Sequence, residues 1–296
     1  MQENSTKSGF VSIVGRPNAG KSTLLNRLAG EKISIVTDKP QTTRHVIRGI
    51  VTRPEGQVVF LDTPGIHKPI HRMNERMMKF VRDAMADVDL IMLIVDCSVP
   101  FGNGDEFTLN LIQDLPKPKF LLLNKIDQIE KNLLLPIIER YSKQVDFAEI
   151  LPLSALTGEN IDRLMERVWA QMPIGPMFYP DDQITDQPAR TITAEVIREK
   201  LIAQTREELP YSTAVVIDRF EEKEPVYRIY ATIYVERESQ KGIVIGTGGQ
   251  VLKRVGTDAR LELEHFFEHK IYLELQVKVK KDWRNDSAAL RSIGLE

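Results

Sequence analysis

Four short motifs carry the chemistry of this chain, and the first is Gly-Arg-Pro-Asn-Ala-Gly-Lys-Ser at residues 15–22. It fits G-x-x-x-x-G-K-[ST], in which backbone N–H groups face a phosphate chain, the lysine reaches the β- and γ-phosphates and the hydroxyl binds Mg²⁺. Alone, such a match could be an ordinary glycine turn before a helix. The predicted phosphate-binding residues are Gly15, Asn18, Ala19, Gly20, Lys21, Ser22 and Thr23.

The next motif is Asp62-Thr63-Pro64-Gly65, which ends a predicted strand. From there the Asp62 carboxylate could reach Mg²⁺ through water, and the Gly65 N–H could reach the γ-phosphate. Between the two motifs, we favour Thr43 over Thr42 as the residue whose hydroxyl joins Mg²⁺ while GTP is bound; the alternative is a polar loop with helix-capping threonines. The predicted metal ligands are Ser22, Thr43 and Asp62, and the predicted catalytic residues are Lys21, Thr43 and Gly65.

Asn124-Lys125-Ile126-Asp127 indicates which base the site accepts. An aspartate at 127 could accept hydrogen bonds from guanine N1–H and the 2-amino group, whereas adenine lacks that amino group. Sites built on such hydrogen bonds reject the analogue by roughly 10⁴–10⁵. Asn124 would brace the loop, and Lys125 would lay its stem over the base. Within Ser154-Ala155-Leu156, the Ala155 N–H could donate to guanine O6, so we expect GTP and GDP as ligands.

The residue that follows Gly65 is Ile66. In Ras-like proteins a glutamine at this place orients the attacking water, which an isoleucine cannot do. We therefore expect hydrolysis to be slow or to draw on another group. The amide oxygen of Asn18 could hold a monovalent cation such as K⁺ near the phosphates, where its charge would replace that of an arginine finger; this is a hypothesis.

The elements around these motifs predict an α/β domain with a mostly parallel sheet and helices on both faces, because apolar strands alternate with amphipathic helices up to about Met172. Ligands of such sheets bind at the C-terminal ends of the strands, where all four motifs fall. The predicted strands are 10–14, 46–52, 58–62, 89–96, 120–124 and 149–153. The predicted helices are 22–28, 73–85, 106–115, 133–141 and 161–169.

Composition narrows the class of protein. The 296 residues carry a formal net charge of −2, which excludes a generally basic nucleic-acid binder. The single cysteine, Cys97, excludes an internal disulfide and is expected to be a small buried residue at a strand end. We expect no signal peptide, because the start of the chain has no apolar core, and no membrane span, because the longest apolar stretch, residues 90–95, is too short. A cytoplasmic monomer is expected, and peripheral contact with the inner membrane face stays open.

Prolines at 173, 176, 180 and 188 can continue neither a helix nor a central strand, so they predict a linker. The pattern after the linker changes from regular strand-helix alternation to the order α-β-β-α-α-β. The predicted elements are a helix at 191–208, strands at 213–220 and 226–236, helices at 242–255 and 258–269, and a strand at 271–280.

Gly246 and Gly249 frame a G-x-x-G loop in this second part, with Ile243 and Ile245 expected as core anchors before it. Such a loop is the signature of a KH domain, whose backbone clamps four nucleotides of RNA. Residues 190–296 hold 18 basic and 18 acidic side chains, so RNA affinity must rest on a local patch. The predicted RNA-binding residues are Lys241, Gly242, Ile245, Gly246, Thr247, Gly248, Gly249, Lys253 and Arg254.

Together these motifs resemble the Era family of bacterial GTPases, in which a G domain precedes a type II KH domain. The resemblance spans nearly the whole chain and includes Gln41-Thr42-Thr43-Arg44, the isoleucine at 66 and the ending Trp283…Ala289-Leu290-Arg291-Ser292. It implies a slow, Mg²⁺-dependent GTPase that binds small-subunit ribosomal RNA near its 3′ end and assists assembly of the small ribosomal subunit. Family members often carry a basic residue inside the G-x-x-G loop, where this chain has Thr247 and Gly248.

The predicted organisation is a G domain at 1–174, a linker at 175–190, a KH domain at 191–282 and a tail at 283–296. Two other functions stay open. The second domain could bind a protein or membrane surface, although the G-x-x-G loop argues against it. The chain could also be a nucleotide-dependent RNA-processing enzyme, although the KH segment has neither a nuclease carboxylate cluster nor a metal-ligand set in its sequence.

Overall fold

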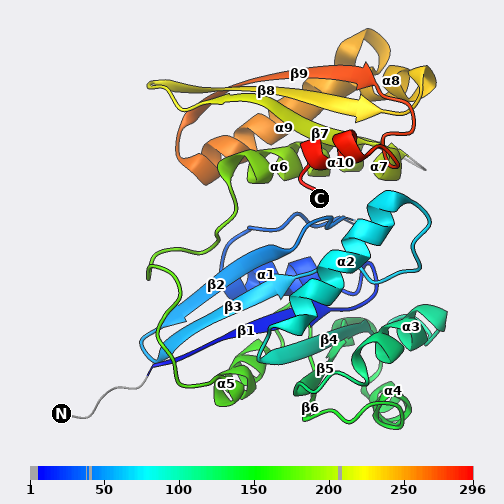
Figure 1. Ribbon diagram of the computed structural model, residues 1–296, viewed down its shortest axis with the longest axis vertical. Coiled ribbons are helices and arrows are strands. Elements are labelled where there is room, and N and C mark those ends of the chain that lie inside the picture. The colour runs from blue at the N-terminus through cyan, green and yellow to red at the C-terminus, as the bar shows by residue number, and fades with distance from the viewer. Residues whose placement is uncertain (1–5, 38, 40–41, 206–208, 296) are drawn as a thin grey trace. The chain divides into compact units, whose positions relative to one another are not determined.

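The chain forms two compact units in its computed structural model, which describes residues 6–37, 39, 42–205 and 209–295 (Figure 1). The described residues of the first unit fall within Met1–Ser34, Pro40–Pro69 and Met77–Asp186, and those of the second within Ile35–Lys39, Ile70–Arg76 and Gln187–Glu296. None of the described helices is long and apolar enough to cross a membrane.

The first unit is built on a six-stranded sheet in the order β2-β3-β1-β4-β5-β6. Among the described strands of this sheet, only β2 and β3 pair antiparallel, so the predicted mostly parallel sheet is confirmed. Strands β3 and β5 are buried along their whole length, which explains their uninterrupted apolar runs. The strands are β1 Lys7–Val14, β2 Ile47–Arg53, β3 Gly56–Asp62, β4 Leu90–Asp96, β5 Lys119–Asn124 and β6 Glu149–Pro152. Cys97 follows β4 and is buried, as expected.

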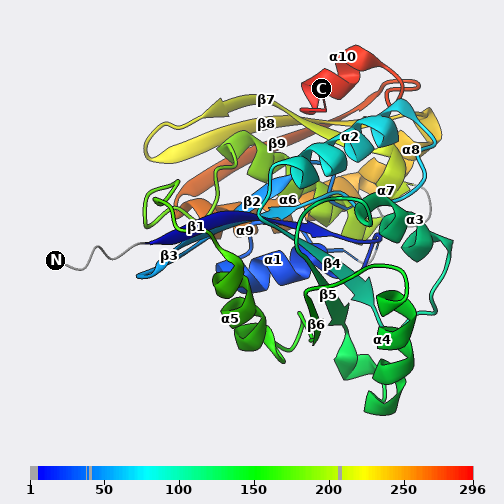
Figure 2. The ribbon, with the colours of Figure 1, turned by 60° about the horizontal axis from the view of Figure 1, so that its bottom comes forward.

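Helices cover both faces of this sheet, as predicted (Figure 2). Helices α1 and α5 pack into the core on one face, and α2, α3 and α4 pack into the core on the other. They are α1 Lys21–Ala29, α2 Arg72–Ala86, α3 Asn103–Ile112, α4 Leu134–Ser142 and α5 Ile161–Gln171. Helix α3 begins before its predicted range because Asp105 Oδ2 accepts the N–H of Gly102 at 2.9 Å and satisfies a donor at the helix start.

The second unit holds a three-stranded sheet in the order β7-β8-β9, antiparallel between β7 and β8 and parallel between β8 and β9. One face of the sheet packs on the helices through a single core that includes Ile197, Ile229, Val244 and Leu263. The strands are β7 Ala214–Glu221, β8 Val226–Val235 and β9 Lys270–Val279. The helices are α6 Ala189–Gln204, α7 Leu209–Ser212, α8 Glu238–Ile245, α9 Gln250–Phe267 and α10 Ser287–Ser292.

The predicted division of the two central helices is wrong. Helix α8 ends before residues 246–249, where Gly246, Gly248 and Gly249 all have φ between 60° and 78°. Helix α9 then runs through position 256 without interruption. Glycine adopts these φ values more readily than other residues, which explains the loop at 246–249. At position 256, by contrast, the buried neighbours Val255 and Ala259 keep the chain helical.

Ile243 is not a core anchor, because its side chain is 53% exposed. Its neighbour Val244 is fully buried instead, and Ile245 is partly buried against the same core. The short helices α7 and α10 were not predicted. Trp283 Nε1 donates to the carbonyl of Ser212 at 2.9 Å and ties the segment after β9 to α7. The end of the predicted helix 191–208 lies outside the described residues, and α6 ends at Gln204.

Candidate nucleotide and RNA sites

The phosphate-binding loop connects β1 to α1 at the C-terminal edge of the sheet. Gly20 has φ 102°, and a Cβ at this position would lie 2.2 Å from Asn124 Nδ2, so no other residue fits. Lys21 Nζ donates to the carbonyl oxygens of Gly15 at 3.2 Å and Arg16 at 2.9 Å, which holds the ammonium group across the loop. Burial lowers the pKa of Lys21 to about 8, and the nearby Asp62 carboxylate opposes this shift.

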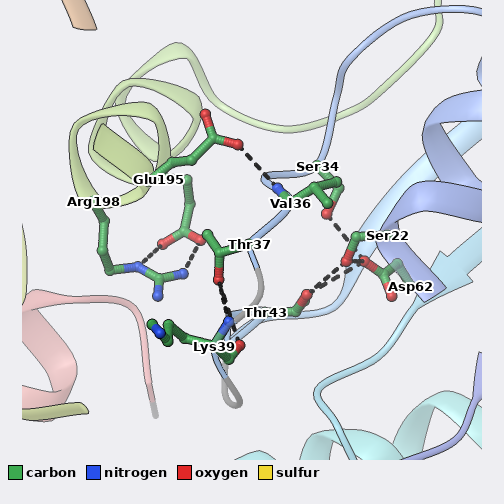
Figure 3. A network of polar contacts seen from close by, with 10 residues as sticks. Ser22, Ser34, Val36, Thr37, Lys39, Thr43, Asp62, Glu195 and Arg198 are labelled. Atoms are coloured by element: carbon green, nitrogen blue, oxygen red, sulfur yellow. Dashed lines mark hydrogen bonds and ion pairs between the residues drawn. The ribbon is translucent and has the colours of Figure 1, made fainter. Parts of the chain in front are cut away.

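The three predicted metal ligands, Ser22, Thr43 and Asp62, lie together (Figure 3). Ser22 Oγ donates to Asp62 Oδ2 at 2.7 Å and lies 2.9 Å from Thr43 Oγ1, which is itself 3.4 Å from Asp62 Oδ2. Ser34 Oγ also donates to Asp62 Oδ2, at 3.0 Å, and no sequence motif indicated this residue. The structure thus brings together oxygen atoms from the phosphate-binding loop, the segment around Thr43 and the end of β3.

Asp62 has the properties that a magnesium site requires. Its side chain is fully buried, and among the described residues its Oδ1 atom has no hydrogen-bond partner. Burial raises the pKa of Asp62, whereas the charge of Lys21 and three hydroxyl donors lower it; burial has the larger effect. Mg²⁺ prefers oxygen ligands and binds through one or two carboxylates, hydroxyls and substrate phosphates, so this donor set fits it. Bound there, the metal would neutralise charge that develops during phosphoryl transfer.

Gly65 and Ile66 lie directly against the phosphate-binding loop. A Cβ on Gly65 would be 2.8 Å from Pro17 Cα, and the Ile66 N–H donates to the Gly15 carbonyl at 3.0 Å. The Ile66 side chain is 1% exposed and belongs to the core under α2. The side chain after Gly65 therefore points into the protein interior and cannot orient a water molecule.

Asn124 joins the phosphate-binding loop to the predicted base-binding loop. Its Nδ2 donates to the Ala19 carbonyl at 2.8 Å, and its Oδ1 accepts the Ala155 N–H at 2.9 Å. Ala155 N–H is the group assigned above to guanine O6, so contact with O6 would require this donor to be shared between two acceptors. Lys125 has φ 65° and forms an ion pair with Asp96, a partner that the motifs did not indicate.

The remaining predicted base-binding residues lie at the C-terminal edge of the sheet. Asp127 is exposed in a short 3₁₀ turn after β5, so its carboxylate is accessible to a ligand. Ser154 is fully buried, and its Oγ accepts the N–H of Thr157 at 3.1 Å. Arg27, at the end of α1, donates to the carbonyls of Ala155 and Leu156 and holds this loop in place. No sequence signal marked Arg27, because its partners are backbone atoms far along the chain.

The G-x-x-G loop of the second unit joins α8 to α9. A Cβ on Gly246 would lie 2.5 Å from Val251 Cγ2, whereas at Gly248 and Gly249 it would meet no atom within 4 Å. Gly246 is thus required by packing, and the other two leave the backbone open to an approaching ligand. Lys253, on the first turn of α9, and Arg254, which follows it, are both exposed, with Arg254 3.9 Å from Asp258.

A groove of about 420 Å³ begins at Gly249 and runs between α9 and β9. Its walls combine apolar side chains such as Leu252 and Leu273 with the basic residues Lys253 and Arg260. Of the predicted RNA-binding residues, only Gly249 and Lys253 line it. The others lie on α8, in the loop or on the next turn of α9. Sequence analysis missed the β9 wall because strand β9 lies far from the loop in the sequence.

Comparison with known proteins finds matches to both parts of the chain. A family model for 50S ribosome-binding GTPases matches residues 10–125, and a KH-domain model matches residues 208–284. The GTPase Era of Staphylococcus haemolyticus is 49% identical over 289 residues, which cover 97% of each chain. A crystal structure of Era in complex with MgGDPNP and nucleotides 1506–1542 of 16S ribosomal RNA has a TM-score of 0.94 and 40% identity. An Aquifex aeolicus Era variant bound to GDP·AlF₄⁻ has a TM-score of 0.94 and 39% identity. Each alignment covers 98% of this chain and 99% of the other.

The fold and the sites define a P-loop GTPase with a C-terminal KH domain. At 49% identity over nearly the full length of a curated relative, the chain belongs to the Era family of GTPases. It is an enzyme that binds GTP and hydrolyses it to GDP and phosphate with the help of Mg²⁺.

Proposed function

We propose that this GTPase binds small-subunit ribosomal RNA near its 3′ end through the KH domain and assists assembly of the small ribosomal subunit. The observation that carries the proposal is the groove between α9 and β9 at the G-x-x-G loop, in a chain whose full-length structural neighbour holds nucleotides 1506–1542 of 16S ribosomal RNA. The proposed domains are residues 1–174, 175–190, 191–282 and 283–296, as G domain, linker, KH domain and tail.

The groove offers the chemistry that single-stranded RNA requires. Gly248 and Gly249 carry no side chain, so the sugar-phosphate backbone could approach the N–H groups of the loop closely. Leu252 and Leu273 give apolar walls for unstacked bases, and Lys253 places positive charge at the edge. Arg260 also lines the groove but is paired with Glu264 at 3.0 Å, and Glu274 adds a negative charge. The loop itself has no basic side chain, so affinity would depend on close backbone contact and on the charges of α9.

For the G domain, we propose that Lys21 and the loop N–H groups bind the phosphates, that Ser22, Thr43 and Asp62 hold Mg²⁺, and that Asp127 selects guanine. The convergence of Ser22, Thr43 and Asp62 at hydrogen-bond distance supports the metal assignment. The bracing of residues 19 and 155 by Asn124 supports the base assignment.

We further propose that a K⁺ ion near Asn18 supplies the charge that an arginine finger provides in other GTPases, since the buried Ile66 cannot orient the attacking water. Asn18 has φ 62°, a conformation that asparagine tolerates better than most residues. The test variant is therefore Asn18→Gly, which removes the side-chain amide and can adopt the same backbone conformation. Hydrolysis by the wild-type protein should be faster in K⁺ than in Na⁺, and Asn18→Gly should lose the difference. Equal wild-type rates in the two salts would exclude the cation.

An electrophoretic shift assay with an RNA oligonucleotide of the 3′ end of small-subunit ribosomal RNA tests the RNA proposal. Gly248→Asp with Gly249→Asp adds two negative charges where the phosphates would approach. Aspartate tolerates positive φ better than most residues, and no atom blocks its Cβ at either position. The RNA shift should disappear while GTP affinity stays unchanged.

The matched control is Gln113→Asp with Gln144→Asp, which adds the same charge at two exposed positions in the first unit. This control should bind RNA as the wild-type protein does. A folded Gly248→Asp, Gly249→Asp protein that still binds the oligonucleotide at wild-type strength would contradict the KH assignment. It would favour a second domain that contacts a protein or a membrane surface.

A further inference from the structure

A second pocket lies within the first unit and uses none of the residues assigned to nucleotide, metal or RNA. It has a volume of about 620 Å³, and its walls come from helix α2, strands β1, β2 and β3 and the residues just before β2. Figures 1 and 2 show α2 on the face of the sheet near these strands. Its apolar walls include Phe10, Val46, Leu61 and Phe80, of which Phe10 and Val46 pack on the core beneath α2.

Two carboxylates stand at the edge of this apolar pocket. Asp83 and Asp87 are both exposed and lie one helical turn apart, at the end of α2 and just beyond it. Neither forms an ion pair with any residue that the structure describes, not even Asp83 with Lys79 one turn earlier. The guanidinium of Arg48, which also lines the pocket, is already paired with Asp186 at 2.8 Å. The pocket therefore joins an apolar floor to a rim with two unpaired negative charges.

We propose that this pocket docks a segment of a partner protein that presents an apolar side chain flanked by arginine or lysine. Charge complementarity favours a basic partner segment, because the two rim carboxylates attract basic side chains, while Arg48 in the lining is already paired with Asp186. A pocket of this size has room for one large apolar side chain, and an amphipathic helix places basic residues one turn from such an anchor.

The position of the pocket makes docking sensitive to the bound nucleotide, and this part of the inference rests on the proposed nucleotide site. One wall includes His45 and Val46, two and three residues after Thr43, and the opposite wall is α2, which follows Gly65 in the chain. Thr43 and Gly65 are the residues proposed to contact Mg²⁺ and the γ-phosphate. Any shift that GTP causes in them changes the spacing of the two walls.

Fluorescence anisotropy with the full-length protein in its GDP state tests the docking proposal. The probe is a short, dye-labelled helical peptide with leucine and phenylalanine on one face and arginine on both flanks. A second peptide carries glutamate in place of every arginine. The protein variants are Asp83→Asn with Asp87→Asn, and the control Asp114→Asn with Asp146→Asn, which removes the same charge from exposed positions outside the pocket.

The arginine peptide should bind saturably and the glutamate peptide should not. The Asp83→Asn, Asp87→Asn protein should bind the arginine peptide roughly tenfold more weakly, about 1.4 kcal/mol in total, since exposed ion pairs each contribute little. The control protein should bind as the wild type does. Unchanged affinity in the Asp83→Asn, Asp87→Asn protein, or equal binding of both peptides, overturns the proposal. If the peptide does not bind and the same variant alters the sedimentation of the protein alone, the occupant is a second copy of this chain and the proposal is wrong.

A second arm replaces GDP by a non-hydrolysable GTP analogue with Mg²⁺. The affinity for the arginine peptide should change by at least threefold. Equal affinity in the two states, with tight binding of both nucleotides, overturns the nucleotide dependence and leaves docking intact. Failure to bind either nucleotide would instead count against the proposed nucleotide site.

Discussion

Single residues hold the two nucleotide-binding loops at a fixed separation. Asn124 spans them with one hydrogen bond on each side, and the absence of a side chain at Gly20 leaves room for its amide. Lys21 is buried, and its hydrogen bonds to carbonyls of the same loop keep its ammonium group in place. These hydrogen bonds hold the phosphate and base loops in contact, and loops that are held in this way lower the ordering cost of binding.

The base preference depends on the carboxylate of Asp127. Asp127→Asn should shift preference from GTP toward xanthosine triphosphate, because the 2-amino donor of guanine is an acceptor in xanthine and pairs with the new amide. Binding assays with both nucleotides measure the shift. A variant that retains full preference for GTP would show that Asp127 does not contact the base.

Gly20→Ala should lower GTP affinity by at least tenfold, about 1.4 kcal/mol, because the new Cβ would displace Asn124. The matched control is Gly30→Ala, at the end of the same helix, where φ is also positive but no atom lies within 4 Å of the new Cβ. That control should lose only about 1–2 kcal/mol of unfolding free energy and keep its GTP affinity. Similar GTP affinities in the two variants would mean that the Asn124 bridge is not needed for binding.

Elements differ in how well the sequence predicts them. The motif-bearing strands of the first unit could be predicted because buried parallel strands have uninterrupted apolar runs. The boundary between α8 and α9 could not be predicted, because the sequence does not distinguish Gly256 from the glycines at 246–249. Only packing decides which of these glycines lies within a helix. Ser34 and Arg27 were missed because their roles depend on contacts with residues 28 and 128 positions away in the chain.

The segment between β3 and α2 combines Gly65, a proposed catalytic residue, with Ile66, a buried core residue. Ile66→Ala should lower the free energy of unfolding by roughly 2–5 kcal/mol, since the side chain is 1% exposed. Its effect on hydrolysis per folded molecule should be far smaller than that of Lys21→Ala, because Ile66 donates no side-chain hydrogen bond to the reaction. Chemical denaturation and single-turnover hydrolysis measure the two effects. A loss of hydrolysis as large as that of Lys21→Ala would give Ile66 a direct part in catalysis.

The molecule as a whole has almost no charge with which to attract RNA. Its formal net charge is −2, and basic and acidic residues balance over residues 190–296. Recognition of ribosomal RNA must therefore rest on a local surface. In the proposed groove Lys253 is available to contact phosphates, whereas Arg260 is paired with Glu264. Affinity for RNA should fall only gently as salt rises, since the salt dependence scales with the number of neutralised phosphates.

Crosslinking to RNA in cells, followed by sequencing, tests the central claim most directly. Wild-type protein should yield crosslinks concentrated at the 3′ end of small-subunit ribosomal RNA. Gly248→Asp with Gly249→Asp should lose these crosslinks at equal protein abundance, and the Gln113→Asp, Gln144→Asp control should keep them. Crosslinks spread over unrelated RNAs, or unchanged at the same 3′ end in the Gly248→Asp, Gly249→Asp protein, would contradict recognition of this RNA by the KH groove.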